Sequence, residues 1–192
     1  MSGAAARRLI LASRSPQRKA ILEQLGVCFE VRAAGVEELE AGPPSELALE
    51  NARRKASAVA GDAHPEALIL GADTIVALDG RVYGKPADAG AARRTLEALS
   101  GRRHEVIGGI CLIHGQRTRT AVARTLVEFR ELDRRLLEWY LATDEWRERA
   151  GGYAIQGKGA ALVRALSGDY LNVVGLPLGA LLELEPGLLW AR

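Results

Sequence analysis

The stretch "LILASRSPQRKAILEQLG", Leu9–Gly26, contains two patterns of side chains that meet at its centre. Its first residues form a short leucine-rich run that is typical of a buried strand. Ser15 and Pro16 then supply the N-cap and first-turn pair that begins a helix, and Gly26 is a residue type at which helices commonly end. A strand that leads directly into a helix favours an α/β fold.

Strands and helices continue to alternate along the chain. Two long strands, residues 104–115 and 117–132, meet tightly at Gly115, so we expect an antiparallel hairpin and a sheet that is not purely parallel. We therefore expect one domain over residues 1–192, an α/β fold in which a long, mixed, twisted sheet is flanked by helices and two lobes enclose a central cleft. The predicted helices are residues 16–26, 46–61 (capped by Ser45), 89–101 (capped by Asp88), 133–152 and one after Pro177.

The composition is that of a globular protein without a strong charge bias. Of the 192 residues, 48% are hydrophobic and 26% are charged, and the formal net charge is +2. Aromatic residues make up only 5%, and no basic run is interleaved with the Tyr or Phe that stacking platforms for nucleic acids need. We therefore expect no nucleic-acid partner.

The sequence predicts a cytoplasmic protein without membrane contact. No apolar run has the length of a membrane span, and the N-terminal segment "MSGAAARRLILAS" lacks a signal-peptide core. Cys28 and Cys111 lie in apolar runs, without the spacing of a metal site or a disulfide framework. We expect both to be buried free thiols, which suits a reducing compartment.

The turn after the first strand has the features of a phosphate site. A helix N-terminus offers unpaired N–H groups and a partial positive charge. Ser13 and Ser15 add hydroxyl groups, and Arg18 adds a guanidinium fork that matches phosphate oxygens. The alternative is an ordinary capped helix with a surface arginine.

The segment "GADTIVALDGRVYGKP", residues 71–86, carries a second set of polar residues. We interpret it as the end of one strand, a break, a second strand and a hairpin turn at Asp79-Gly80. Asp73 would then lie at a strand end, where it could bind Mg²⁺ or take a proton from water. Lys85, in a Gly-Lys-Pro turn, could reach back toward Asp73 as a positive charge. The alternative is a turn-capping Asp and a solvated Lys.

Three further segments supply weaker candidates. In "GVEELE", Glu37 and Glu38 could supply a second metal ligand, although most acidic pairs in loops are only solvated. The helical stretch "ENARRKA" contains three successive cations, of which Lys55 is one, and at most one of them can point into a cleft. In "YAIQGKGA", Gln156 follows an expected strand, and its amide could bind the edge of a nucleobase, or it could simply end the strand.

These groups together indicate chemistry on a polyanion with a divalent metal. They comprise cations, hydroxyl groups, carboxylates and a helix N-terminus, but no evident nucleophilic side chain. Water is then the natural attacking group, and the sequence predicts metal-assisted hydrolysis of a phosphoanhydride.

The quoted segments, together with "LSGRRHEVIGG" and "GDYLNVVGLPL", resemble in this order the Maf family of nucleoside triphosphate pyrophosphatases over nearly the whole chain. The resemblance implies a fold akin to that of the inosine triphosphate pyrophosphatases, with Mg²⁺ or Mn²⁺ as cofactor. It also implies hydrolysis of a nucleoside triphosphate to the monophosphate and pyrophosphate.

The resemblance also implies roles for individual residues. Asp73 stands where the family has its catalytic base, and we expect Glu38 and Asp73 to hold the metal. The water would attack the α-phosphorus. The remaining polar positions of the family's site, which would hold the phosphates, correspond to Ser13, Arg18, Lys55 and Lys85, and Ser15 caps the same turn.

The nucleobase is indicated by three positions. Thr74 and Gln156 are the residues of the family branch that resembles dTTP/UTP pyrophosphatases. That branch has Arg where this chain has Gln17, and a small residue where it has Arg14, so Arg14 could supply the missing cation. We expect dTTP and UTP, or modified pyrimidine nucleotides, as substrates, with 7-methyl-GTP or another base as the alternative.

Other classes of function remain open at this point. One is a phosphatase that releases inorganic phosphate, and another is a non-catalytic module that binds nucleic acid or a division protein. The apolar tail "GLPLGALLELEPGLLW" leaves room for a homodimer, which the family often forms.

Overall fold

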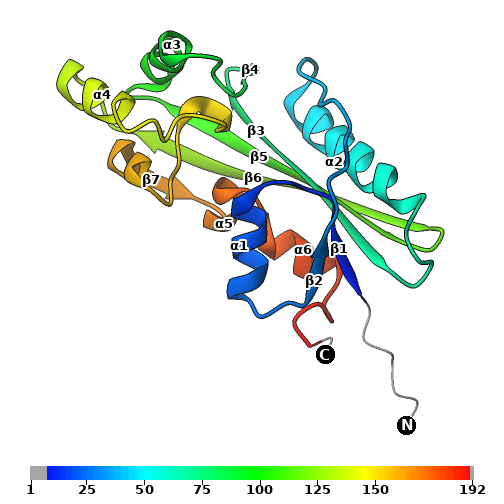
Figure 1. Cartoon of the computed structure of the whole chain (residues 1–192). Helices are drawn as coiled ribbons and strands as arrows, with labels where there is room; N and C mark the ends of the chain where they lie inside the picture. The colour runs from blue at the N-terminus through cyan, green and yellow to red at the C-terminus, as the bar shows by residue number, and fades with distance from the viewer. Residues whose placement is uncertain (1–7, 191–192) are drawn as a thin grey trace.

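The computed structural model describes residues 8–190 and is built on a sheet of seven strands (Figure 1). The strands are β1 (Leu9–Leu11), β2 (Phe29–Val31), β3 (Leu68–Leu78), β4 (Arg81–Tyr83), β5 (Arg103–His114), β6 (Arg117–Phe129) and β7 (Val163–Ser167). Their order is β2-β1-β3-β5-β6-β7, and β4 also pairs with β3. β1 is parallel to β2 and to β3, whereas the other pairs are antiparallel. The predicted α/β fold with a mixed sheet is confirmed.

Helices cover both faces of this sheet. They are α1 (Pro16–Gln24), α2 (Pro44–Ala60), α3 (Ala89–Leu99), α4 (Arg134–Leu141), α5 (Tyr170–Val174) and α6 (Leu178–Leu184), with the 3₁₀ helices η1 (Ala150–Gly152) and η2 (Lys158–Leu162). α2 packs against one face of β3 and β5. α1 and α6 lie on the other face at one end of the sheet, and α3 and α4 lie at the far end (Figure 1).

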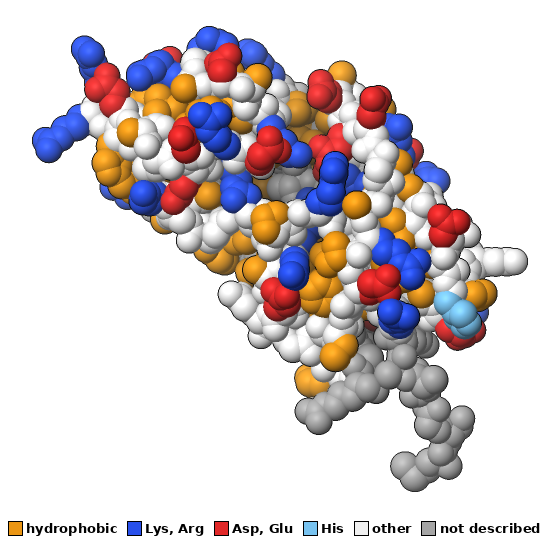
Figure 2. Space-filling model, in the orientation of Figure 1, with side chains coloured by type: hydrophobic (Ala, Val, Ile, Leu, Met, Phe, Trp, Pro, Cys, Tyr) orange, Lys and Arg blue, Asp and Glu red, His pale blue; other side chains and the backbone are white. Residues whose placement is uncertain are grey.

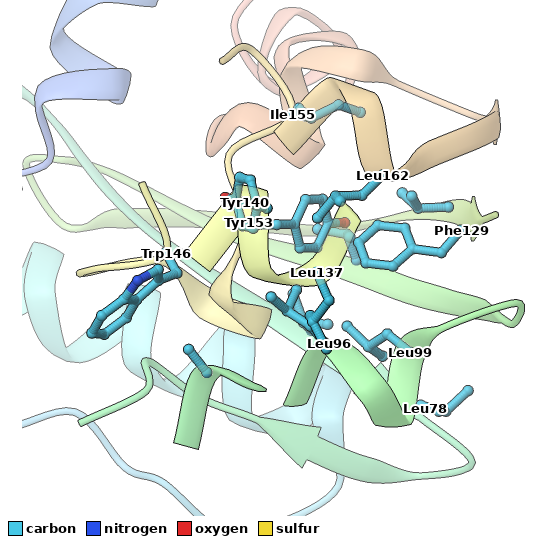
Figure 3. Packing of buried hydrophobic residues seen from close by; sticks show 14 residues of the cluster. Leu78, Leu96, Leu99, Phe129, Leu137, Tyr140, Trp146, Tyr153, Ile155 and Leu162 are labelled. Atoms are coloured by element: carbon cyan, nitrogen blue, oxygen red, sulfur yellow. The ribbon is translucent and has the colours of Figure 1, made fainter. Parts of the chain in front are cut away.

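The face opposite α2 carries two separate apolar cores. Leu68, Leu70 and Ala72 of β3 pack with α1 and α6 in the first core. Val76 and Leu78, further along the same strand, pack in the second core with side chains of α3, α4, β6 and the segment around Tyr153. Figure 3 shows this core, with Leu78 and Tyr153 among its labelled members. Thr74 lies between the two cores on this face of β3. Each core belongs to one lobe, and β3 connects the two lobes.

One edge of β3 is open between the two lobes. β5 pairs with the other edge of β3 along residues 68–77. On the open side, β1 pairs only with residues 68–70 and β4 only with residues 76–78. Within the described part of the chain, no strand pairs with residues 71–75 on that side. This gap leaves room for a ligand beside both faces of the strand.

Several local predictions are confirmed. The side chain of Asp88 accepts a hydrogen bond from the Ala91 N–H at the start of α3. β5 and β6 pair from Arg103–Glu128 to His114–Arg117, as the tight turn at Gly115 indicated. The turn from β3 to β4 has φ of 51° at Asp79 and 76° at Gly80, the positive values that a type I′ hairpin needs. The final helix begins after Pro177 as expected.

The predicted break before Asp73 is wrong. β3 is continuous, and Asp73 lies near its middle, opposite Gly109 of β5. The Gly-Ala pair serves close packing of a helix and not a strand end. A Cβ atom at Gly71 would lie 2.2 Å from the carbonyl oxygen of Ala52, because the backbone of α2 lies directly on the strand.

The helix predicted over residues 133–152 is wrong in its second half. Asp133 caps α4 as a helix start should, but α4 ends at Leu141. Asp144 and Glu148 then adopt left-handed φ values of 58° and 56°, which no helix can contain. The indole of Trp146 donates to the carbonyl oxygen of Leu141 and so stabilises the turn that replaces the helix.

Three smaller predictions are also wrong. The expected strand at Tyr153 is an irregular segment that leads into η2. α2 begins at Pro44 with Pro43 as its N-cap, so Ser45 lies within its first turn. Cys111 is buried as expected, but Cys28 is exposed because it lies in the turn between α1 and β2.

The helices were compared with what a membrane span requires. Among residues 8–190, no helix has both the length and the apolar character that crossing a membrane requires. The N-terminal residues 1–7, which belong to the segment expected to lack a signal-peptide core, lie outside the described residues.

We predict that Gly109→Ala destabilises the fold, because a Cβ atom there would lie 2.3 Å from the carbonyl oxygen of Ala48 on α2. Overpacking of this kind typically costs about 1–3 kcal/mol of unfolding free energy, which urea denaturation would measure. Gly61→Ala is the control, since nothing lies within 4 Å of the position that its methyl group would occupy and its φ is −59°. Equal stability of the two variants would contradict the close packing of α2.

Candidate active site

A cleft of about 880 Å³ opens at the gap in the edge of β3. Its face is hollowed near the centre in Figure 2, where acidic and basic side chains gather around the opening. The expected cleft between two lobes is therefore present. Glu37, the alternative to Glu38 as a metal ligand, does not line it. The other residues predicted for the site do, namely Ser13, Ser15, Gln17, Arg18, Glu38, Lys55, Asp73, Thr74, Lys85 and Gln156.

Lys55 lies at the centre of the acidic part of the cleft. Its ammonium group is 2.5 Å from Oε1 of Glu38 and 2.7 Å from Oδ1 of Asp73. Lys55 is 7% exposed and Asp73 is 5% exposed, so this ion pair is nearly removed from water. A helix, a loop and a strand thus bring three charges to one point, where the cation offsets the repulsion between the carboxylates.

The other oxygen of Asp73 is held by Asn51, a residue that the sequence analysis missed. The Asn51 amide donates to Oδ2 of Asp73 at 3.1 Å and to the carbonyl oxygen of Leu39 at 3.0 Å. Its own oxygen accepts from the Leu39 N–H at 2.7 Å. Asn51 stands four residues before Lys55, and this spacing places both on one face of α2, a signal that the sequence did contain.

The N-terminus of α1 forms the opposite part of the cleft. Ser15 caps the helix by accepting from the Arg18 N–H at 3.4 Å, and its own N–H donates to the Ser13 hydroxyl at 3.1 Å. The expected helix start is confirmed. Ser13, Ser15 and Gln17 of this turn line the cleft, and a helix N-terminus placed in this way can bind an anion.

The Arg18 guanidinium is buried and engaged by protein groups on three sides. It donates to the carbonyl oxygen of Gly175 at 2.8 Å, to the Ser13 hydroxyl at 3.0 Å and to the Thr74 hydroxyl at 3.2 Å. Burial lowers the pKa of Arg18, while the charges of Asp73 and Glu38 act in the opposite direction. Arg18 thus braces the helix start against β3 and the turn before Leu176.

The remaining predicted residues lie around the rim. The Lys85 ammonium is 3.6 Å from Oε2 of Glu38, so this carboxylate connects cations from two sides of the cleft. The Gln17 oxygen accepts from the Ser15 hydroxyl at 3.2 Å. Arg14 and Gln156 are exposed and line the cleft as well.

The protonation of Glu38 depends on its neighbours. Burial alone would raise the pKa of Glu38, but the hydrogen bond and charge of Lys55, with smaller contributions from Lys85 and Arg18, outweigh it. The resulting pKa lies below the usual value, and Glu38 is therefore an anion at neutral pH.

A metal ion would have only part of its ligand set from the protein. Among residues 8–190, no three side chains of His, Cys, Asp or Glu surround a common point. Glu38 and Asp73 nevertheless converge on Lys55, and both are oxygen donors. Mg²⁺ is commonly bound by one or two carboxylates together with substrate phosphates and water, so this pair fits such an ion.

The sequence of this chain matches one family of known proteins. The family model described as "Maf-like protein" matches residues 8–185. A dTTP/UTP pyrophosphatase of Symbiobacterium thermophilum is 48% identical over 89% of this chain and 89% of its own. One of Pyrococcus furiosus is 43% identical over 93% and 94%. Among solved structures, the Staphylococcus aureus Ham1 protein aligns over 64% of this chain and 72% of its own, with 17% identity and a TM-score of 0.46.

We predict that Lys55→Met raises the pKa of Glu38. The substitution removes the hydrogen bond and the charge that lower this pKa, while the burial that raises it remains. The midpoint of the Glu38 carboxyl signal in a carbon NMR titration would move to higher pH. Arg53→Met is the control on the same helix, because Arg53 is exposed and pairs with Glu50. An unchanged Glu38 midpoint in a folded Lys55→Met protein would contradict the assigned role of Lys55.

Proposed function

This chain belongs to the Maf family, and from that premise we propose that it hydrolyses nucleoside triphosphates, dTTP and UTP first, to the monophosphate and pyrophosphate. The observation that carries the proposal is the convergence of Glu38, Lys55 and Asp73 opposite a helix N-terminus in one cleft. Relatives that bear the name dTTP/UTP pyrophosphatase support it at 43–48% identity.

The phosphates are proposed to bind between the start of α1 and Lys85. The Gln17 N–H and the Ser13 hydroxyl donate to phosphate oxygens, and the exposed Lys85 adds a positive charge from its turn. The Ser15 hydroxyl joins them once it leaves the Gln17 oxygen. Arg18 fixes the position of Ser13 and of the helix start through the contacts described above. These donors are in place before the substrate binds, so little reorganisation is needed as charge develops.

Asp73 is proposed to accept the proton of the attacking water. Each of its oxygens already accepts one hydrogen bond, from Lys55 and from Asn51, and each retains capacity for a second. The two protein contacts orient the carboxylate toward the cleft. The water oxygen bonds to the α-phosphorus, the bond from that phosphorus to the bridging oxygen breaks, and pyrophosphate leaves.

Glu38 and Asp73 would hold a divalent cation, Mg²⁺ or Mn²⁺. When bound, the ion supplies positive charge that offsets the charge of the phosphates. Lys55 keeps the two carboxylates together in the protein itself, so the site retains its shape without the ion.

Base selection is proposed to involve Thr74, Gln156 and Gln17. Gln156 is exposed on the rim, where its amide can bind the edge of a base. Thr74 lines the same cleft, and its hydroxyl accepts a hydrogen bond from Arg18. Gln17 stands where the dTTP/UTP branch has Arg, and the exposed Arg14 of the same turn supplies the cation that Gln17 lacks.

We extend the proposal to the compartment and the oligomeric state. Both cysteines are free, and the exposed thiol of Cys28 suits the reducing cytoplasm. A homodimer is part of the proposal, and analytical ultracentrifugation would test it.

A substrate panel tests the proposed reaction. The protein is incubated with Mg²⁺ and each of dTTP, UTP, CTP, 7-methyl-GTP, GTP, ITP and ATP, and pyrophosphate and orthophosphate are assayed separately. We expect pyrophosphate from dTTP and UTP. Pyrophosphate only from a nucleotide with another base would support the proposed reaction. It would also identify Gln17 as the residue that changes the base preference. Orthophosphate as the primary product would identify a phosphatase instead, and no turnover would leave only a binding role.

We predict that Asp73→Asn lowers kcat for dTTP by about two or more orders of magnitude, the usual scale for loss of a general base. Asp79→Asn is the matched control. Asp79 is exposed in the turn after β3, pairs with Arg102 and has a φ of 51°, which Asn tolerates. Steady-state kinetics should show Asp79→Asn within a factor of about two of the wild type. Near-normal activity of Asp73→Asn would remove Asp73 from the mechanism.

A further inference from the structure

Arg149 is a cation of the cleft that the proposed function has not used. It lines the cleft, and its Nε atom is buried without a hydrogen-bond partner. Within residues 8–190, the Arg149 side chain has neither a hydrogen bond nor an ion pair with any protein group. Arg147, two residues earlier, differs in each respect, because it pairs with Asp144 at 3.1 Å and lies over the Trp146 ring.

The backbone holds Arg149 beside the Lys85 turn. The Gly151 N–H donates to the carbonyl oxygen of Gly84 at 3.1 Å, which joins η1 to the residue before Lys85. Gly151 itself has a φ of 68°, and a Cβ atom there would lie 2.9 Å from the Val76 side chain. The segment therefore packs against β3 at a defined position, and Arg149 and Lys85 lie in neighbouring stretches of the cleft wall.

Arg149 is half-buried, whereas Arg18 and Lys55 are the buried cations of the cleft among residues 8–190, and both are already occupied. Lys55 is held between two carboxylates, and Arg18 donates to three protein oxygens. The buried Nε–H of Arg149 is costly to leave unpaired, so a ligand that accepts from it gains affinity. A guanidinium group presents parallel donors that match two oxygens of a phosphate.

We propose that Arg149 is a substrate-binding residue that donates to the β- and γ-phosphates, the part of the nucleotide that leaves as pyrophosphate. This inference rests on the proposed pyrophosphatase function. The α-phosphate must lie near Asp73 and Glu38 if water is activated there, and Lys55 is neutralised by these same carboxylates. Arg149 and Lys85 then supply the cations for the leaving group, on which negative charge grows as the bond to the α-phosphorus breaks.

Calorimetric titration with the two products separately tests this assignment. Inorganic pyrophosphate and dTMP are titrated into the wild type, Arg149→Met and the control Arg147→Met, all at one Mg²⁺ concentration. We expect Arg149→Met to raise the Kd of pyrophosphate about tenfold or more, the scale of one lost charged hydrogen bond, and to leave the Kd of dTMP within about twofold. Arg147→Met should change neither Kd.

Two results would overturn the inference. One is an unchanged Kd of pyrophosphate in Arg149→Met, and the other is an equal loss of dTMP affinity, which would place Arg149 at the nucleoside. If circular dichroism shows that Arg149→Met is unfolded, Arg149→Gln is measured against the same criteria. Wild-type turnover is assayed in parallel, so absence of hydrolysis with intact pyrophosphate binding would reject the proposed function and not the role of Arg149.

Discussion

The contact between the Lys55 ammonium and the carboxylates of Glu38 and Asp73 is the interaction on which the site depends. Two carboxylates that contact the same ammonium group would repel each other without it, and Asp73 is too deeply buried for water to screen its charge. Lys55 offsets both charges and connects α2, the loop before it and β3 in one contact. Asn51 adds the second connection between the same three elements, so the acidic end of the cleft is held in shape by protein contacts alone.

The close approach of α2 to the sheet makes this contact reachable. Gly71 and Gly109 have no side chains, and the helix backbone therefore lies against β3 and β5. Lys55 and Asn51 of this helix therefore contact Asp73 directly. The gap beside residues 71–75, between β1 and β4, exposes the same point to ligand. Packing and pairing of the sheet thus decide where the chemistry can occur.

Local chemistry explains which features could be predicted from the sequence. Ser15-Pro16, Asp88 and Asp79-Gly80 act through bonds within a few residues, and their helix starts and hairpin appear as expected. The Gly-Ala pair before Asp73 was misinterpreted because only the tertiary position of α2 shows what the small residues accommodate. The helix over residues 133–152 ends early for a similar reason, since the turn around Trp146 is stabilised by burial that periodicity does not reveal. Arg149 has no local signal at all, because its environment is made by β3 and the Lys85 turn.

Asp73, with Glu38 and Lys55 beside it, directs water to the α-phosphorus in the mechanism that we propose. Hydrolysis of dTTP in oxygen-18 water, followed by mass spectrometry of both products, tests it most directly. We predict one labelled oxygen in dTMP and none in the pyrophosphate, because the new bond forms at the α-phosphorus. Label in the pyrophosphate with unlabelled dTMP would mean attack at the β-phosphorus, and would contradict the placement of the α-phosphate beside Asp73.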